Sequence, residues 1–327
     1  MKLFIQVCFT ITILIFLEIY AKAGVTPSTL FGLAGCGRDA EATLYTINSS
    51  TGAATAVGSG VGFSRCGGMD FDSNGTLFAG CTRLGTTNAV LITVDPTTGT
   101  GTEVGEMCGS SADSATDFSF RNADDVLFGI LFETLMGGTC TDDGYQTINT
   151  TTGAPTTIGL SGLIGLCGIG TAFSPTDTLF LADEACNTCI EQMSPLDGDL
   201  YTVNQLTGAA TQIATLPFPN PPFDDCARPN AMDFQPGNGV LFVSIVNGGP
   251  AFTQPRTNYI TTINTTSGDV TVIGQTVECI DAIAFGPTPE PTGPLVIIPT
   301  MSQWGIIIAT ILLGFFAIAA LRRRTES

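Results

Sequence analysis

The sequence predicts an all-β protein: a five-bladed β-propeller of four-stranded blades, closed by a blade that the two ends of the domain share. Three observations predict this fold. One hairpin segment recurs five times, a second hairpin segment alternates with it, and the strand that the last copy lacks is found near the N-terminus. We also expect a transmembrane helix at the C-terminus.

The first hairpin segment starts with an apolar residue or tyrosine, has Asn or Asp at its fifth position and ends in glycine. Its copies are Leu44–Gly52, Leu91–Gly99, Tyr145–Gly153, Leu200–Gly208 and Ile260–Gly268. Alternating apolar and polar residues indicate a strand, and the Asn or Asp with the closing glycine indicates a turn. The aligned Asn and Asp residues are 47 to 60 residues apart. This period fits propeller blades better than the rungs of a β-solenoid, which, with a sandwich, is the alternative.

The second hairpin segment has a strand that ends in phenylalanine, a polar turn and a strand that begins with Leu-Phe or reaches it after one residue. Its copies are Met69–Phe78, Thr116–Phe128, Thr171–Phe180 and Met232–Phe242. A fifth copy, Asp281–Phe285, has no Leu-Phe strand after it. Thr29–Leu33 supplies that strand from the other end of the domain. One C-terminal and three N-terminal strands then form one blade, which closes the ring.

The two ends of the chain are targeting segments. Residues 1–23 have a basic start, an apolar stretch and an Ala-Lys-Ala site, as in a secretory signal peptide, with a retained N-terminal anchor as the alternative. The propeller is expected over residues 24–286. Residues 287–297 form a Pro-rich spacer, and residues 298–327 contain about sixteen apolar residues followed by an Arg cluster, which indicates a transmembrane helix.

This last segment resembles the IPTL-type C-terminal sorting signals of Gram-negative bacteria. The residues that carry the resemblance are Ile298, Pro299, Thr300, Met301, Trp304, Gly305, Arg322, Arg323 and Arg324. Methionine stands at position 301 in place of the usual leucine. The resemblance implies an exosortase-like processing enzyme and display at the cell surface; a plain membrane anchor is the alternative. The hairpin copies are in turn similar to secreted bacterial repeat proteins with LYTINPTTG-type hairpins, which implies a propeller-like architecture.

Ten cysteines follow the signal peptide, and all are expected in connections on one face of the propeller. An even number in an exported chain indicates disulfides. The expected pairs are Cys66–Cys81, Cys108–Cys140, Cys167–Cys186, Cys189–Cys226 and Cys36–Cys279. Cys186 and Cys189 can exchange roles, and their CxxC spacing alternatively indicates a redox or zinc site.

The formal net charge is −18 and the chain has no histidine. The charge excludes a basic nucleic-acid binder, and the composition excludes imidazole chemistry. Calcium is the one candidate cofactor. The DxDxNG spacing of Asp70, Asp72 and Asn74 occurs in calcium loops, although an A–B hairpin with Asn74-Gly75 as its turn is the favoured interpretation. Further acidic residues are expected on the cysteine-bearing face: Asp142, Asp143, Asp224 and Asp225.

The sequence has no GxSxG, Walker or HExxH signature. We therefore expect a binding or structural module of the bacterial envelope rather than an enzyme, with a glycan, a matrix polymer or another surface protein as ligand. The alternative is a Ca²⁺-dependent extracytoplasmic hydrolase that uses the Asp-rich loops. A scaffold without a specific ligand is a third interpretation.

Overall fold

The computed structural model describes eight segments of the chain. They are residues 28–35, 40–107, 114–132, 144–163, 166–185, 197–223, 227–247 and 257–286. These residues form β-strands and their connections, and they contain no helix long and apolar enough to cross a membrane. The predicted signal peptide, Pro-rich spacer, sorting motif and C-terminal helix lie outside the described residues.

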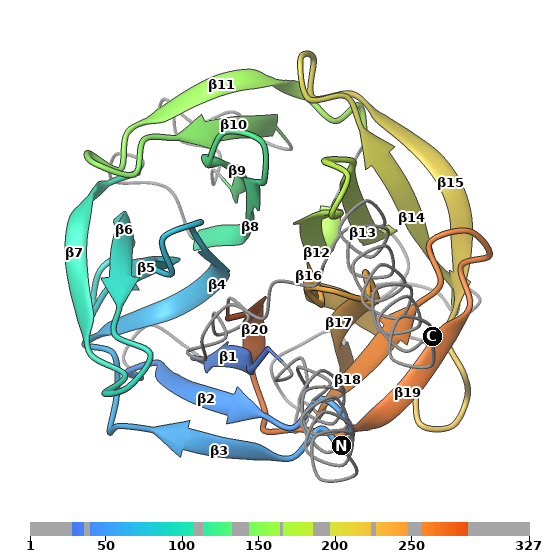
Figure 1. The fold of residues 1–327 in the computed structure, drawn as a ribbon, viewed down its shortest axis with the longest axis horizontal. Helices are drawn as coiled ribbons and strands as arrows, with labels where there is room; N and C mark the ends of the chain where they lie inside the picture. Colours follow the sequence, from blue (N-terminus) through green and yellow to red (C-terminus); the bar gives the residue numbers. More distant parts are fainter. Residues whose placement is uncertain are drawn as a thin grey trace, which may run out of the picture. The chain divides into compact units, whose positions relative to one another are not determined.

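In the described part of the chain twenty strands form five four-stranded antiparallel sheets, arranged as blades around a common centre (Figure 1). We number the blades along the chain and name their strands A to D from the centre outward. Blade 1 consists of β20 (Ile280–Phe285), β1 (Leu30–Ala34), β2 (Thr43–Ile47) and β3 (Ala54–Val57). Blade 2 consists of β4 (Phe63–Phe71), β5 (Leu77–Arg83), β6 (Ala89–Val94) and β7 (Gly101–Glu106).

The other three blades follow the same order. Blade 3 consists of β8 (Ser114–Arg121), β9 (Val126–Phe132), β10 (Gly144–Ile148) and β11 (Pro155–Leu160). Blade 4 consists of β12 (Leu166–Phe173), β13 (Leu179–Ala185), β14 (Asp197–Val203) and β15 (Ala210–Pro217). Blade 5 consists of β16 (Arg228–Phe234), β17 (Leu241–Asn247), β18 (Thr257–Ile263) and β19 (Val270–Gln275). The predicted five-bladed propeller is confirmed.

Blade 1 joins the two ends of the domain. β20 pairs with β1, and Leu30 lies opposite Phe285. The A strands of neighbouring blades contact one another around the whole ring, from β20 through β4, β8, β12 and β16 back to β20. This confirms the predicted closure by one C-terminal and three N-terminal strands.

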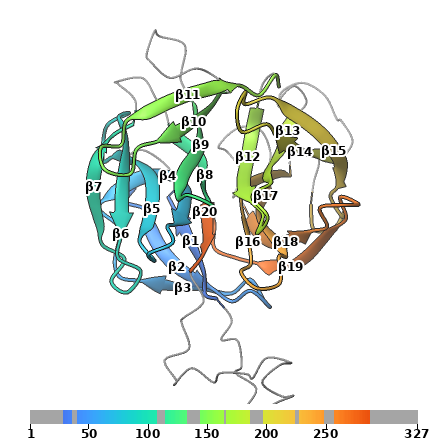
Figure 2. The ribbon, with the colours of Figure 1, turned by 45° about the horizontal axis from the view of Figure 1, so that its top comes forward.

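The connections define two faces of the propeller, seen obliquely in Figure 2. Because neighbouring strands are antiparallel, the A–B and C–D turns lie on one face, which we call the turn face. The B–C and D–A connections lie on the other, which we call the loop face. β1 starts and β20 ends at the turn face, so Ser28 and Gly286, at the two ends of the described domain, both lie there.

One pair of phenylalanines packs at every interface between blades. The ring at the end of strand A in one blade meets a ring from strand B of the blade before it, with centroids 5.0–5.6 Å apart. The pairs are Phe31–Phe71, Phe78–Phe120, Phe128–Phe173, Phe180–Phe234 and Phe242–Phe285. Tilted and edge-on geometries of this kind are the favourable ones for aromatic pairs. The phenylalanines of the second hairpin segment therefore form the core between blades.

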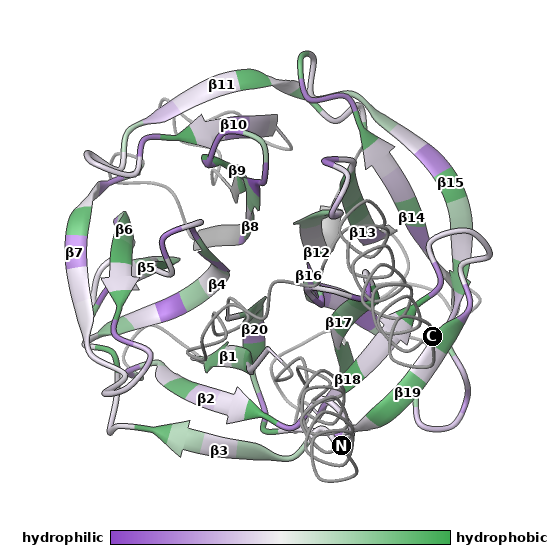
Figure 3. Cartoon of the chain, in the orientation of Figure 1, coloured by the Kyte–Doolittle hydropathy of each residue, from purple (hydrophilic) through white to green (hydrophobic). Residues whose placement is uncertain are grey.

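Glycines join the blades at the outer rim. Gly153 ends the C–D turn of blade 3 with φ +76°, and a Cβ there would lie 2.6 Å from the carbonyl oxygen of Gly105 in β7. Neither residue can therefore carry a side chain without separating blades 2 and 3. At the other four interfaces an added Cβ would likewise meet a carbonyl oxygen of the neighbouring D strand: that of Val57 for Gly99, Gly159 for Gly208, Thr215 for Gly268 and Gly274 for Gly52. Figure 3 shows hydrophilic and hydrophobic residues mixed along outer strands such as β7, which is half-exposed.

Candidate functional site

Acidic side chains of the A strands fasten neighbouring blades to one another. Asp70 Oδ2 in β4 accepts the backbone N–H of Phe120 in β8, at 2.6 Å. Asp233 Oδ2 in β16 accepts the backbone N–H of Phe285 in β20, also at 2.6 Å. In both cases the donor is the phenylalanine whose ring packs at that interface. The carboxylate thus fixes the backbone of a residue that forms the core between the blades.

The remaining A-strand phenylalanines have their own acceptors. Ser119 Oγ in β8 accepts the backbone N–H of Phe173 at 2.9 Å. The N–H groups of Phe71 and Phe234 are instead bonded within their own blades, by Asp70 Oδ1 and Asp233 Oδ1 at 2.7 Å. Phe71 belongs to blade 2 and Phe234 to blade 5. The blades before them, blades 1 and 4, have alanine (Ala284 and Ala172) where the other blades have the accepting Asp or Ser. Every one of the five N–H groups is therefore satisfied, as buried backbone donors require.

Asp117 in β8 connects three blades at once. Its Oδ1 accepts the backbone N–H of Phe118 at 2.9 Å. Its Oδ2 accepts the backbone N–H groups of Thr171 in blade 4 at 2.8 Å and of Met232 in blade 5 at 3.1 Å. Asp117 is completely buried. One carboxylate therefore links the A strands of blades 3, 4 and 5.

Burial makes the carboxyl groups of Asp70, Asp117 and Asp233 weaker acids than an exposed aspartate. It raises the pKa of Asp70 to about 7, against the lowering effect of the N–H groups of Phe120 and Phe71. Burial also raises the pKa of Asp117 well above its usual value. The pKa of Asp233 is raised by burial and then by the negative charge of Asp70. The centre of the propeller thus holds carboxyl groups whose oxygens already accept backbone N–H groups and whose pKa values are all raised by burial.

The predicted calcium loop forms a hairpin turn. Asp72 Oδ1 accepts the backbone N–H groups of Asn74 (3.0 Å) and Thr76 (2.6 Å), which closes the A–B turn of blade 2. Asp70 instead points toward blade 3, so the structure does not direct the three predicted ligands at one point. Among the described residues no group of three acidic or cysteine side chains is placed to hold a metal ion. The other predicted ligands, Asp142, Asp143, Asp224 and Asp225, lie outside the described residues.

The Cys66–Cys81 disulfide is present, with an S–S distance of 2.04 Å. Both cysteines lie within strands, β4 and β5, and not in the connections where the sequence placed them, because these strands are longer than expected. Cys279, in the connection before β20, is also disulfide-bonded. Cys167 falls in β12, but its side chain is outside the described part of the structure. The other predicted disulfide cysteines are also outside it: Cys36, Cys108, Cys140, Cys186, Cys189 and Cys226.

The two faces differ in their connections. The C–D turns are all six residues long, and the A–B turns have four to six. On the loop face the connections range from four residues, at 276–279, to eleven, at 133–143 and 186–196. Turns of one length and one design are expected where the backbone alone sets the geometry. Connections of variable length are where proteins build binding sites on a rigid scaffold. The loop face is therefore the candidate functional surface.

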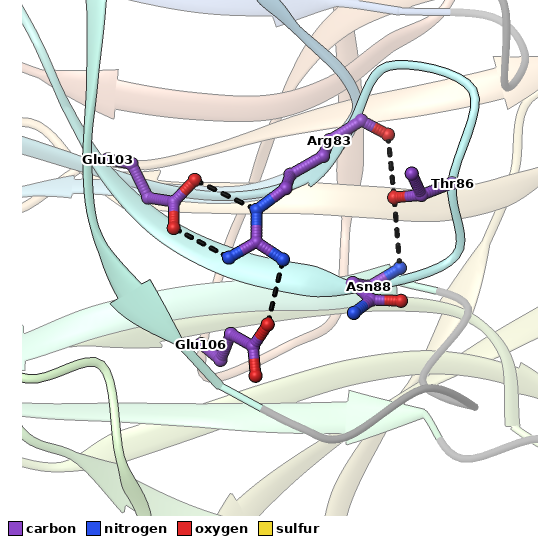
Figure 4. Close-up of polar contacts among 5 residues, drawn as sticks. All are labelled: Arg83, Thr86, Asn88, Glu103 and Glu106. Atoms are coloured by element: carbon purple, nitrogen blue, oxygen red, sulfur yellow. Dashed lines mark hydrogen bonds and ion pairs between the residues drawn. The ribbon is translucent and has the colours of Figure 1, made fainter.

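An ion-pair group braces the loop face of blade 2 (Figure 4). The Arg83 guanidinium donates to both oxygens of Glu103 (2.9 and 2.7 Å) and to Glu106 (2.8 Å). These bonds hold the pKa of each glutamate below its usual value. The Thr86 hydroxyl donates to the Arg83 carbonyl at 2.9 Å and accepts the Asn88 backbone N–H at 3.3 Å. The connection between β5 and β6 is thus held in one shape.

A second polar group lies in blade 4. Asp199, two residues into β14 from the loop face, accepts a hydrogen bond from Gln212 Nε2 (2.5 Å) and one from the Tyr201 hydroxyl (3.2 Å). Burial, and then the charge of Asp199, raise the pKa of Tyr201. Asp183, which is buried, pairs with Asp199 across the two strands. This group offers a phenol, a carboxylate and an amide to a polar ligand.

The residues that fasten the blades were missed by sequence reasoning, although a signal is present. Asp70, Ser119 and Asp233 each directly precede the phenylalanine that ends strand A. When the copies of the second hairpin segment are aligned at this phenylalanine, the three acceptors share the position before it. The remaining two blades have alanine at that position. Asp117 lies outside that position, two residues before Ser119, and no comparable signal reveals its contacts with two other blades.

Neither a family model nor a curated protein matches the sequence. Solved structures with similar folds include an exo-β-1,3-galactanase from Phanerochaete chrysosporium, at 12% identity and a TM-score of 0.49, over 75% of this chain and 60% of that one. Another is a periplasmic gluconolactonase from Pseudomonas aeruginosa, at 12% identity and a TM-score of 0.43, over 77% of this chain and 84% of that one. A third is a protein from Lactobacillus plantarum, at 10% identity and a TM-score of 0.43, over 76% and 82% of the two chains. At these identities the likeness concerns the fold alone.

Proposed function

We propose that the chain is an exported binding module of the bacterial envelope, and that its ligand contacts the loop face. The observation that carries this proposal is the difference between the two faces. The C–D turns of the turn face all have six residues, whereas the connections of the loop face vary from four to eleven. The carboxylates at the centre are engaged with backbone N–H groups, which favours the loops over the centre as the place of contact.

The charge of the chain limits the ligand. At a net charge of −18, the protein repels anionic polymers and lipid headgroups. Neutral or cationic ligands are favoured. The group of Asp199, Tyr201 and Gln212 supplies hydrogen-bond donors and acceptors beside an aromatic ring, a combination that suits the hydroxyl groups and apolar faces of a neutral polysaccharide.

The arrangement of the ends is consistent with display. Gly286, after which the Pro-rich spacer begins in the sequence, lies on the turn face and donates its backbone N–H to the Thr29 carbonyl at 2.8 Å. The point of attachment is therefore on the face opposite the one proposed to contact the ligand. We propose that an exosortase-like enzyme acts on the sorting motif and that the C-terminal helix anchors the chain in the membrane until then.

Binding is tested with two variants that make the same change on opposite faces. Leu84, in the connection braced by Arg83, is 44% exposed on the loop face, and Leu206, in the C–D turn of blade 4, is 86% exposed on the turn face. Protein recovered from the host envelope is applied to a glycan array and to purified neutral surface polysaccharide of the host. We expect Leu84→Arg to weaken binding several-fold and Leu206→Arg to leave it unchanged.

A second pair of variants tests the polar group. Tyr201→Phe removes the hydroxyl that bonds Asp199 and keeps the ring, whereas Tyr259→Phe makes the same change in blade 5. Weaker binding by the first variant alone supports a contact between the ligand and this group. Equal binding by all four variants would contradict the loop-face proposal. Release of a cleaved product that requires Ca²⁺ would instead identify the hydrolase.

A further inference from the structure

The five C–D turns share one hydrogen-bonding design. The first residue of each turn is Asn or Asp, and its side-chain Oδ1 accepts the backbone N–H of the residue two positions later, at 2.8–2.9 Å. The accepting residues are Asn48, Asp95, Asn149, Asn204 and Asn264. The bond folds the side chain over the turn through its oxygen.

Two hydroxyl positions in these turns have different uses. The hydroxyl three residues after the first Asn or Asp accepts a backbone N–H in all five turns, at 3.3–3.4 Å. The second position lies two residues after the first Asn or Asp of the turn. In blade 4 this position is Leu206, whose side chain is 86% exposed. The turn therefore does not need a hydroxyl at this second position.

Three turns nevertheless combine an asparagine with a hydroxyl two positions later. The pairs are Asn48 with Ser50, Asn149 with Thr151, and Asn264 with Thr266. All six residues are exposed, and within the described residues neither the asparagine Nδ2 nor the second hydroxyl has a hydrogen-bond partner. Asn-x-Ser/Thr with x other than proline is the acceptor pattern for N-glycosylation in exported proteins.

We propose that Asn48, Asn149 and Asn264 are N-glycosylation sites, so that the turn face of blades 1, 3 and 5 carries glycans. The donor is an oligosaccharide linked to a lipid diphosphate. A bond forms between Nδ2 and C1 of the first sugar, the bond from C1 to the phosphate oxygen breaks, the lipid diphosphate leaves, and one amide proton passes to a base of the transferase. The inference requires export of the chain but no ligand of the loop face.

The chain contains its own comparison sites. Asn74-Gly75-Thr76 has the same pattern, but Asn74 Nδ2 is engaged by Asp72 Oδ2 at 3.4 Å, so we expect less modification there. Asn204 occupies the shared turn without a hydroxyl two positions later. Asp95 has the hydroxyl of Thr97 but no amide, and Pro96 lies between them.

The test is mass spectrometry of peptides from the full-length gene product, recovered from the native host outside the cytoplasmic membrane. We expect glycan mass on the peptides with Asn48, Asn149 and Asn264, and its release by a peptide-N-glycosidase with conversion of asparagine to aspartate. We expect none on Asn204. Unmodified asparagines in the exported protein, glycan on serine or threonine alone, or a chain found in the cytoplasm alone would each overturn the proposal.

Variants of the turns test whether glycosylation depends on the Asn-x-Ser/Thr pattern. Thr151→Val removes the second hydroxyl, which the turn does not need, and should abolish the glycan on Asn149 without changing thermal stability. Leu206→Thr supplies the missing hydroxyl in blade 4 and should create a new site at Asn204. Asp95→Asn should remain unmodified because proline follows it. A glycan that persists on Asn149 in Thr151→Val, or no glycan on Asn204 in Leu206→Thr, would contradict recognition of this pattern.

Discussion

The Asp70 carboxylate of blade 2 accepts the backbone N–H of Phe120 of blade 3 at 2.6 Å, and the Phe120 ring packs against Phe78 of blade 2 with its centroid 5.6 Å away. One residue of blade 3 is thus held by blade 2 through both its backbone and its side chain. Its polar and apolar contacts are made at the same interface, so a change in either should loosen the same pair of blades.

Asp70→Ala should destabilise the propeller by about 2–4 kcal/mol, because the N–H groups of Phe71 and Phe120 would lose their acceptor. Chemical denaturation measures this difference. Asp269→Ala, which removes an exposed aspartate from the C–D turn of blade 5, is the control and should change stability by no more than about 0.5 kcal/mol. Equal effects of the two variants would show that Asp70 does not fasten the blades.

The stability of the protein should fall as the pH rises from about 4 to about 7. The pKa of Asp70 is raised to about 7 by burial, so in this range the folded chain binds more protons than the unfolded chain. Stabilisation by this group is complete below about pH 4, is lost as the pH rises toward 7, and changes little above that. The loss should be on the order of 2 kcal/mol, since partial exposure screens part of the shift.

The pH prediction is checked by denaturation at pH 5 and pH 8, for the wild-type chain and for Asp70→Asn. Asparagine keeps an acceptor oxygen but does not titrate, so the variant should lose part of the difference between the two pH values. Asp117 and Asp233 also have raised pKa values and should preserve the remainder. A wild-type chain that is more stable at pH 8 than at pH 5 would contradict this assignment.

Gly153→Ala should cost about 1–3 kcal/mol, more than Gly237→Ala, although both glycines have positive φ, +76° and +89°. A Cβ on Gly153 would meet the Gly105 carbonyl oxygen at 2.6 Å, whereas a Cβ on Gly237 has no neighbour within 4 Å. The two variants therefore share the backbone penalty and differ in the contact between blades. Thermal unfolding compares them, and equal melting temperatures would show that the rim contact contributes nothing.

Removal of the Cys66–Cys81 disulfide by the double change to alanine should destabilise the chain by about 3 kcal/mol, as expected for a loop closed by residues 15 apart. Replacing both cysteines avoids a free buried thiol. Denaturation without reductant measures the loss. With a reductant present the disulfide no longer contributes, so the stabilities of the wild-type chain and the variant should become equal. A stability difference that persists under reduction would come from packing and not from the disulfide.

Much of the fold was predictable from local patterns. The repeated Asn or Asp and glycine of the C–D turns, and the phenylalanines of the A and B strands, recur because each blade solves the same packing problem. The closing blade followed from one missing strand, and the Cys66–Cys81 pair followed from the expected place of both cysteines on one face of one blade. These features depend on residues close in the sequence, or on counting the strands of each four-stranded blade.

The contacts between blades were harder to predict from the sequence. Asp117 bonds Met232, 115 residues away, and nothing near either residue indicates the other. The spacing of Asp70 from Asp72 makes Asp70 a candidate calcium ligand beside the favoured hairpin turn, and neither interpretation predicts that its carboxylate bonds to blade 3. The contrast between the faces emerges once strand ends are known, since it depends on the lengths of the connections.

The most direct test of the loop-face proposal is hydrogen–deuterium exchange of the full-length chain with and without neutral surface polysaccharide of the host. We expect slower exchange on binding in loop-face connections such as residues 58–62 and 84–88, and unchanged exchange in C–D turns such as residues 149–154 and 264–269. Protection confined to the turn face, or no protection at a polysaccharide concentration that saturates binding, would contradict the proposed orientation of the site.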